Sequence, residues 1–168
     1  IIKNPSNVIS AGVNAISQIN TIKKFINISN LERSVFLIPK TDYKKEIELA
    51  INKTNIRLKD KFIYDKEPTL LTKQIEELTW YSRRKQNLKD EIKRLENSLT
   101  TNKKKKIENL KKRDTLGGIN FDSVIIADFD ESLKSVATSL LYTDVSSKRI
   151  TYIALNQWFD KSLLKETS

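Results

Sequence analysis

Short apolar runs alternate along this chain with longer segments whose apolar residues recur at helical spacing. The runs at 34–38 and 123–127 are too short for helices and are typical of strands that are buried on both faces. Further short strands are predicted at 61–64 and 150–154, and residues 8–10 are interpreted as a short entering strand. Because strands that alternate with helices are typical of parallel βαβ units, we predict an α/β lobe with three layers and a mostly parallel sheet.

Polar residues before the amphipathic segments indicate where the helices begin. Asn14 precedes a segment whose apolar face is regular, and its side chain suits a helix N-cap. After the strand at 34–38, Thr41 or Asp42 is predicted to cap the next helix. After the strand at 123–127, the same role falls to Asp130 or Ser132.

The longest helical stretch begins at Pro68, a residue suited to the first turn of a helix. Its second half carries a seam with the spacing of a coiled coil: Leu88, Ile92, Leu95 and Leu99. After a polar break, Ile107 and Leu110 form the apolar pair of a shorter helix. We therefore predict a helical hairpin over 69–113, inserted into a βαβ unit, in which the seam faces the second helix.

The formal charge of +10 is concentrated in this hairpin. Between Arg83 and Arg113 there are 13 Lys or Arg and 4 Asp or Glu, whereas the rest of the 168 residues hold 18 and 17. Trp80 and Tyr81 lie at its root, and basic residues with aromatics are typical of nucleic-acid binding. A lysine-rich helix is more often simply solvated, so we expect no nucleic acid and favour an interaction arm for an acidic protein or an anionic surface.

The composition argues against catalysis. The chain has no Cys and no His, which excludes disulfides, thiolate sites and the commonest general base. We therefore predict no enzyme activity, no metal and no cofactor. No run approaches the ~18 apolar residues of a membrane span. The sequence begins with Ile and lacks Met, so we expect a piece of a longer polypeptide in which residues 1–168 form one α/β lobe.

Parallel sheets hold their sites at the carboxyl ends of the strands, so the residues that follow each strand are the candidates for ligand binding. Six residues in such positions are predicted to bind a ligand: Asp42, Tyr43, Asp128, Phe129, Asp130 and Asn156. Trp158 follows the last strand and is read equally well as a pocket residue or as core.

The acidic turn at 128–132, which follows the strand at 123–127, resembles the start of haloacid-dehalogenase-like phosphotransferases. In that family the first acid, here Asp128, is a nucleophile that binds Mg²⁺, and the second, here Asp130, is an acid/base. The chain departs from this family because Glu131 replaces a glycine and only 38 residues follow Asp130. We favour the simpler interpretation, in which Asp128 ends the strand and its neighbours cap the helix.

Taken in order, the segments resemble one lobe of a type I periplasmic binding protein, and most closely the penicillin-binding-protein activators of Gram-negative envelopes. The segments that carry the resemblance are 7–12, the strand and loop 34–43 with its terminal Tyr, the helical insertion 79–96, the stretch 113–145 and the last strand 149–158. The resemblance implies an α/β/α lobe, a partner lobe outside this sequence, and a periplasmic location with a lipid anchor outside this fragment.

The resemblance also implies binding of a protein, such as a peptidoglycan synthase, or of a small ligand. In amino-acid-binding relatives, an aromatic pair and an acid line the cleft. The aromatic positions fall on Tyr43 and Phe129, whereas the acid falls near Asn156, which carries no charge. This departure favours a repurposed binding domain over an amino-acid receptor. The alternatives are a solute-binding receptor of an ABC transporter and the phosphotransferase described above.

Overall fold

Four short strands organise the chain. The structure is a computed structural model that describes residues 14–99 and 101–155, so the run at 8–10 lies outside the described residues. The elements follow in this order: α1 (Ala15–Ile28), β1 (Ser34–Pro39), α2 (Lys44–Thr54), β2 (Asp60–Tyr64), α3 (Pro68–Leu78), α4 (Tyr81–Glu96), α5 (Lys103–Lys111), β3 (Ser123–Ile126), α6 (Asp130–Tyr142) and β4 (Thr151–Ala154).

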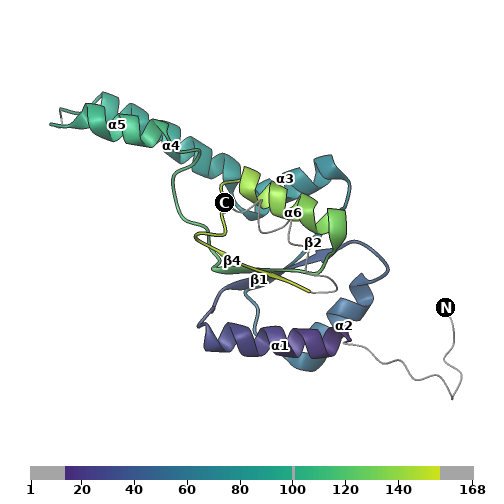
Figure 1. The fold of residues 1–168 in the computed structure, drawn as a ribbon. Coiled ribbons are helices and arrows are strands. Elements are labelled where there is room, and N and C mark those ends of the chain that lie inside the picture. Colours follow the sequence, from purple (N-terminus) through teal and green to yellow (C-terminus); the bar gives the residue numbers. More distant parts are fainter. Residues whose placement is uncertain (1–13, 100, 156–168) are drawn as a thin grey trace, which may run out of the picture.

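All neighbouring strands run parallel, in the spatial order β2-β1-β3-β4. Figure 1 shows α1 and α2 below the sheet and α3 and α6 above it. The fold is therefore a three-layer α/β/α lobe, as predicted. The strands predicted at 34–38, 61–64, 123–127 and 150–154 are all present, and their ends differ from the prediction by at most one residue.

Each face of the sheet has its own apolar core. Successive residues of a strand point to opposite faces, so a central strand contributes to both cores. The core under α1 and α2 includes Ile19, Ile22, Phe36, Ile38, Ile47 and Ile125. The core under α3 and α6 includes Val35, Leu37, Leu71, Ile75, Val124, Ile126, Val136 and Leu140. Every residue of β1 and β3 is buried, whereas the edge strands β2 and β4 are partly exposed.

Two helices begin as predicted. The Asn14 side chain accepts a hydrogen bond from the backbone N–H of Ser17 at 2.9 Å and so caps α1. Pro68 lies at the first position of α3, and the carboxylate of Glu67 accepts hydrogen bonds from two N–H groups of its first turn. These hydrogen bonds lower the pKa of Glu67.

The starts of α2 and α6 differ from the prediction. Tyr43 and Phe129 occupy the two N-cap positions, and neither makes a side-chain capping hydrogen bond. Their rings pack against each other. This contact places the two aromatic residues at the helix starts, where their polar neighbours were expected. The predicted caps were therefore wrong at both helices: Thr41 or Asp42, and Asp130 or Ser132.

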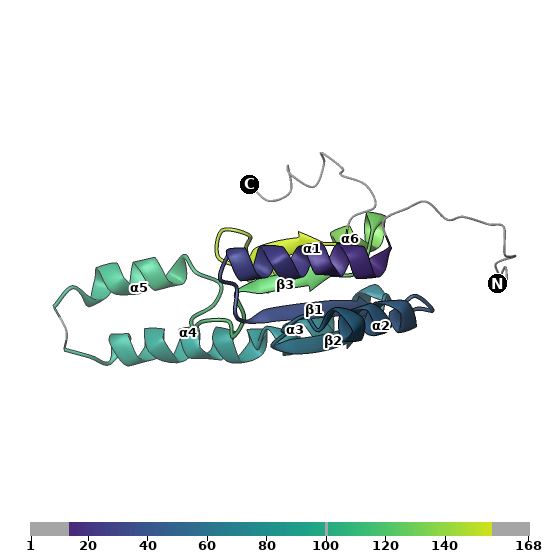
Figure 2. The same ribbon diagram turned by 90° about the horizontal axis from the view of Figure 1, so that it is seen from below.

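The helical region predicted at 69–113 is divided between the body and a projecting arm. Helix α3 belongs to the body, because Leu71 and Ile75 are buried against the sheet. The backbone turns at Trp80, which has a left-handed conformation with φ of 51°. Figure 2 shows that α4 and α5 lie side by side and project from the body. Helices α4 and α5 and the turn between them are named the arm.

The arm has a partial apolar seam. The residues of the seam that are buried or half-buried are Leu88, Ile92, Leu95, Ile107 and Leu110. The prediction was wrong for Leu99, which is 103% exposed. Helix α4 ends at Glu96, so Leu99 lies in the turn rather than on the helix face. No helix of the described residues is long and apolar enough to cross a membrane.

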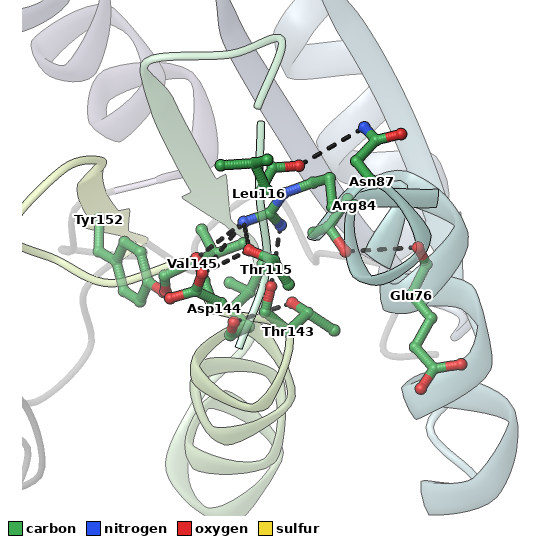
Figure 3. A network of polar contacts seen from close by, with 11 residues as sticks. Glu76, Arg84, Asn87, Thr115, Leu116, Thr143, Asp144, Val145 and Tyr152 are labelled. Carbon is green, nitrogen blue, oxygen red and sulfur yellow. Dashed lines mark hydrogen bonds and ion pairs between the residues drawn. The ribbon is translucent and has the colours of Figure 1, made fainter. Parts of the chain in front are cut away.

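A buried arginine fastens the arm to the body (Figure 3). Arg84, near the start of α4, is 2% exposed. Its Nη1 donates to the carbonyl of Thr143 at 3.0 Å, and its Nη2 donates to Thr115 Oγ1 at 2.7 Å. The same Nη2 lies 3.4 Å from Asp144 Oδ2. We name Arg84, Thr115, Thr143 and Asp144 the Arg84 cluster. The cluster joins α4, the loop before β3 and the end of α6. It lies at the edge of the sheet where the strands begin.

Candidate functional site

The carboxyl ends of the strands meet at the edge of the sheet that lies away from the arm (Figure 2). Asp128 follows β3 at this edge and is 0% exposed. Tyr64, the last residue of β2, donates a hydrogen bond from its hydroxyl to Asp128 Oδ2 at 2.7 Å. Lys66 donates from Nζ to Asp128 Oδ1 at 2.8 Å. These residues are named the Asp128 cluster, and the edge that holds them is named the carboxyl edge.

The Asp128 cluster spans more than two neighbouring strands. Strand β1 lies between β2 and β3, and adjacent strands are about 4.8 Å apart, so the two backbones are separated by about 10 Å. Only long side chains such as those of Tyr64 and Lys66 reach across this distance. Tyr64 pairs in register with Pro39, the last residue of β1. The cluster therefore ties the loop after β2 to the loop after β3, across the end of β1.

The hydrogen bonds of the cluster compensate a buried charge. Asp128 Oδ1 accepts a second hydrogen bond, from the backbone N–H of Phe129 at 3.0 Å, so both carboxylate oxygens have donors. Buried charges are tolerated when they are paired in this way. Burial, together with the hydrogen bond to Asp128, raises the pKa of Tyr64 far above its ordinary value of 10.0, so its hydroxyl remains a proton donor.

Lys66 connects the cluster to solvent. Its side chain is 37% exposed, although the carboxylate it contacts is fully buried. Its Nζ also lies 3.3 Å from Ser132 Oγ in the first turn of α6. The positive charge of Lys66 is therefore accessible from outside while Asp128 holds it in place.

An aromatic pair lies beside the cluster. The rings of Tyr43 and Phe129 meet edge to face, with centroids 5.7 Å apart and planes at 63°. Both residues are half-buried, and burial, with a smaller effect of Glu46, raises the pKa of Tyr43. Since Phe129 directly follows Asp128, the pair and the cluster form one continuous part of the carboxyl edge.

A cleft opens between α3 and α6 next to Lys66. Its inner part has a volume of about 110 Å³ and is lined by Tyr64, Lys66, Leu71, Glu131, Ser132 and Ser135. A wider cleft of about 410 Å³ shares Leu71, Glu131 and Ser135 with it and adds residues farther along both helices. The inner part thus offers a lysine, a carboxylate and two serine hydroxyls, which suit a small polar ligand.

Two of the predicted site residues that the structure describes do not join this arrangement. Asp42 and Asp130 are exposed, and Asp130 has a left-handed backbone with φ of 51°. Asn156 lies outside the described residues. The structure thus brings together Tyr43, Phe129 and Asp128, and it places the other described candidates at the rim.

Two residues of the cluster were missed by sequence reasoning. The strand that contains Tyr64 was predicted, but neither Tyr64 nor Lys66 was given a role. A usable signal was present. The polar run 65–67 follows the strand at 61–64, and all strands of a parallel sheet end at the same edge. That signal would have placed Lys66 at the correct edge without naming Asp128 as its partner.

The chemistry of this edge favours binding. The described residues contain no group of three or more His, Cys, Asp or Glu that could hold a metal ion. Asp128 positions Lys66 and Tyr64, and its two oxygens are occupied by them and by the backbone. The groups left for a ligand are the ammonium of Lys66, the hydroxyls of the cleft and the exposed parts of the aromatic pair.

Comparison of the chain with protein-family models, with curated proteins and with solved structures found no match. Function therefore has to be inferred from the residues of the carboxyl edge and from the resemblance noted in the sequence.

Proposed function

We propose that this chain is a non-catalytic binding domain whose binding surface is the carboxyl edge of the sheet. One observation carries the proposal: Asp128 is fully buried with both oxygens hydrogen-bonded, while Lys66 and the half-buried rings of Tyr43 and Phe129 lie beside it. A firmly held carboxylate that orients a cation next to an aromatic pair suits recognition. Sites of this kind commonly combine an apolar centre with a few fixed polar groups.

The proposed setting is the periplasmic face of a Gram-negative envelope, with the chain acting as a lobe of a penicillin-binding-protein activator. The α/β/α lobe and the helices inserted between β2 and β3 support this, because the segments that carry the resemblance include a helical insertion at 79–96. The partner in this setting is a peptidoglycan synthase that contacts the carboxyl edge.

A second candidate is a solute-binding receptor for a small anionic molecule. The cleft beside Lys66 favours it, because the partly exposed side chain of Lys66 and the hydroxyls of Ser132 and Ser135 line, together with Glu131, a volume of about 110 Å³. The phosphotransferase alternative has less support. Its nucleophile would be Asp128, whose side chain is 0% exposed and fully hydrogen-bonded.

Binding to the peptidoglycan synthase of the same cell tests the proposal. With the synthase immobilised, Tyr43→Ala and Phe129→Ala should each weaken binding by about tenfold or more, since aromatic residues dominate interface energies. Phe25→Ala is the matched control, because Phe25 is an exposed aromatic on α1, away from this edge. Equal losses in the control and the edge variants would contradict the proposal.

The two alternatives are separated by simple probes. A small-solute receptor should show a higher melting temperature with inorganic phosphate or glutamate, and Lys66→Gln should abolish that rise. A phosphotransferase should hydrolyse p-nitrophenyl phosphate in the presence of Mg²⁺, and Asp128→Asn should abolish the activity. We expect no hydrolysis.

A further inference from the structure

The arm holds most of the net positive charge of the chain, and much of that charge is unpaired. Between Arg83 and Arg113 there are 13 Lys or Arg and 4 Asp or Glu. The ion pairs within the described arm and at its root are Arg94 with Glu91 and Arg84 with Asp144. The described lysines of α5 form no ion pair, and these members are exposed: Lys104, Lys105, Lys106 and Lys111.

The charge surrounds α5 instead of following one face. Residues 103–106 are four consecutive lysines, and an α-helix has about 3.6 residues per turn, so they point in every direction around the axis. A partner with a single complementary face would leave part of this charge unused. An extended anionic layer into which the end of the arm settles would contact all of it.

The arm lacks the apolar or aromatic centre of a protein interface. Tyr81, at the start of α4, is buried, residues 83–113 contain no Phe, Tyr or Trp, and the apolar seam is used between α4 and α5. Protein interfaces usually have aromatic or aliphatic anchors, and single-stranded nucleic acid is bound by stacking its bases on aromatics. Charge is therefore the main attraction that the arm offers.

One apolar side chain is the exception. Leu99 is 103% exposed in the turn that joins α4 to α5, beside the lysines at the start of α5. The phosphate backbone of a nucleic-acid duplex offers nothing to a leucine. A lipid bilayer does, because an apolar side chain enters the boundary below the headgroups while neighbouring lysines keep their ammonium groups in the headgroup layer.

We propose that the end of the arm binds the surface of a lipid bilayer that contains anionic lipids. The lysines of α5 contact the headgroups and Leu99 enters the boundary below them. The arm leaves the body where the strands begin, so this attachment leaves the carboxyl edge pointing away from the bilayer (Figure 2). The attraction is electrostatic and is weakened by salt.

Vesicle sedimentation with the full chain tests this. The protein should bind vesicles that contain phosphatidylglycerol and not vesicles of pure phosphatidylcholine, and binding should fall as salt is added. The combined change Lys104→Gln, Lys105→Gln and Lys106→Gln should reduce partitioning by about tenfold or more. Lys103 is left intact because its Nζ donates to the carbonyls of Glu96 and Ser98.

Two further variants sharpen the test. Leu99→Gln, which keeps all charges, should reduce vesicle partitioning about threefold. The matched control neutralises three exposed lysines of the body, by Lys24→Gln, Lys45→Gln and Lys53→Gln, and should leave partitioning nearly unchanged. Unchanged circular dichroism of each variant confirms that it is folded.

Three results would overturn the proposal. The first is equal binding to neutral and anionic vesicles. The second is an equal loss in the body control and the α5 variant, because binding would then follow net charge alone. The third is tighter binding to duplex DNA than to vesicles with no effect of Leu99→Gln, which would identify the arm as a nucleic-acid contact.

Discussion

Among residues 14–99 and 101–155, each end of the sheet buries one charged side chain, and the partners of the two differ. Asp128, at the carboxyl edge, is 0% exposed, and Arg84, at the root of the arm, is 2% exposed. The main partner of Asp128 is Lys66, which is 37% exposed. Arg84 is held by backbone carbonyls, a threonine and Asp144, and its Nε has no hydrogen-bond partner.

The difference distinguishes a candidate binding site, the Asp128 cluster, from a structural anchor, the Arg84 cluster. Burial lowers the pKa of Arg84, and Asp144 only partly opposes that effect, so the guanidinium is enclosed at a free-energy cost. Its contacts join the arm, the loop before β3 and the end of α6, and none of the four residues of the Arg84 cluster lines the clefts described beside Lys66. In the Asp128 cluster, Asp128 holds the side chain of Lys66, which is partly exposed to solvent and lies near the aromatic pair. On this contrast, the Asp128 cluster is the candidate site, and the Arg84 cluster stabilises the root of the arm.

The largest effect is expected at the Arg84 cluster. Arg84→Ala removes the donors for Thr115 and for the carbonyl of Thr143, and it leaves Asp144 without its cation. Breaking a buried pair in this way should lower the free energy of unfolding by about 3–5 kcal/mol, as measured by urea denaturation. The neighbouring Arg83 is exposed, so Arg83→Ala should change it by less than about 0.5 kcal/mol.

A smaller loss is expected at the Asp128 cluster. Asp128→Asn keeps an acceptor for Tyr64 but removes the charge opposite Lys66, whose ammonium can then turn to solvent. The free energy of unfolding should fall by about 2 kcal/mol in the same denaturation experiment. A loss as large as that of Arg84→Ala would show that this cluster is a structural anchor too, and the contrast between the two ends would be wrong.

Shortening the arm should have less effect still. Replacing residues 89–110 by a short flexible linker keeps Arg84 and Leu88, and it should change the free energy of unfolding by less than about 1 kcal/mol. Removing 83–113 also removes Arg84, so that deletion should be about as destabilising as Arg84→Ala. Equal stability of the two deletions would mean that Arg84 does not fasten the arm.

The smallest effect concerns alkaline pH. The pKa of Tyr64 is raised in the folded protein, so the folded state keeps this proton while the unfolded state loses it near the ordinary value of 10.0. The contribution of Tyr64 to stability is therefore complete below about pH 10 and decreases as the pH rises above it. In urea titrations at successive pH values, the free energy of unfolding of Tyr64→Phe should fall less between pH 9 and pH 11 than that of the unchanged protein, because the variant has no such hydroxyl. Parallel pH curves for the two proteins would contradict this.

The sheet was predictable because its strands are short and almost wholly apolar. β1 and β3 are buried on both faces, and such runs have few other interpretations in a chain with alternating helices. The position of the candidate edge followed from the parallel arrangement alone. Tyr43, Phe129 and Asp128 could therefore be placed together before their contacts were known.

Other features depended on the sheet order and on local backbone geometry, which periodicity does not contain. Strand β1 separates β2 from β3, so Lys66 reaches Asp128 only through its long side chain, and this contact depends on the sheet order. A polar interval separates Leu78 from Leu88 in the sequence, but periodicity alone did not show that the backbone turns at Trp80. Leu99 fitted the seam by spacing, but α4 ends at Glu96.

Hydrogen exchange of the full chain with and without the proposed partner, a peptidoglycan synthase, tests the central claim most directly. If the carboxyl edge is the binding surface, the synthase should protect backbone amides at 40–44 and 128–133 and leave those of the arm unchanged. Protection confined to the arm at 83–113, with no change at the carboxyl edge, would contradict the account.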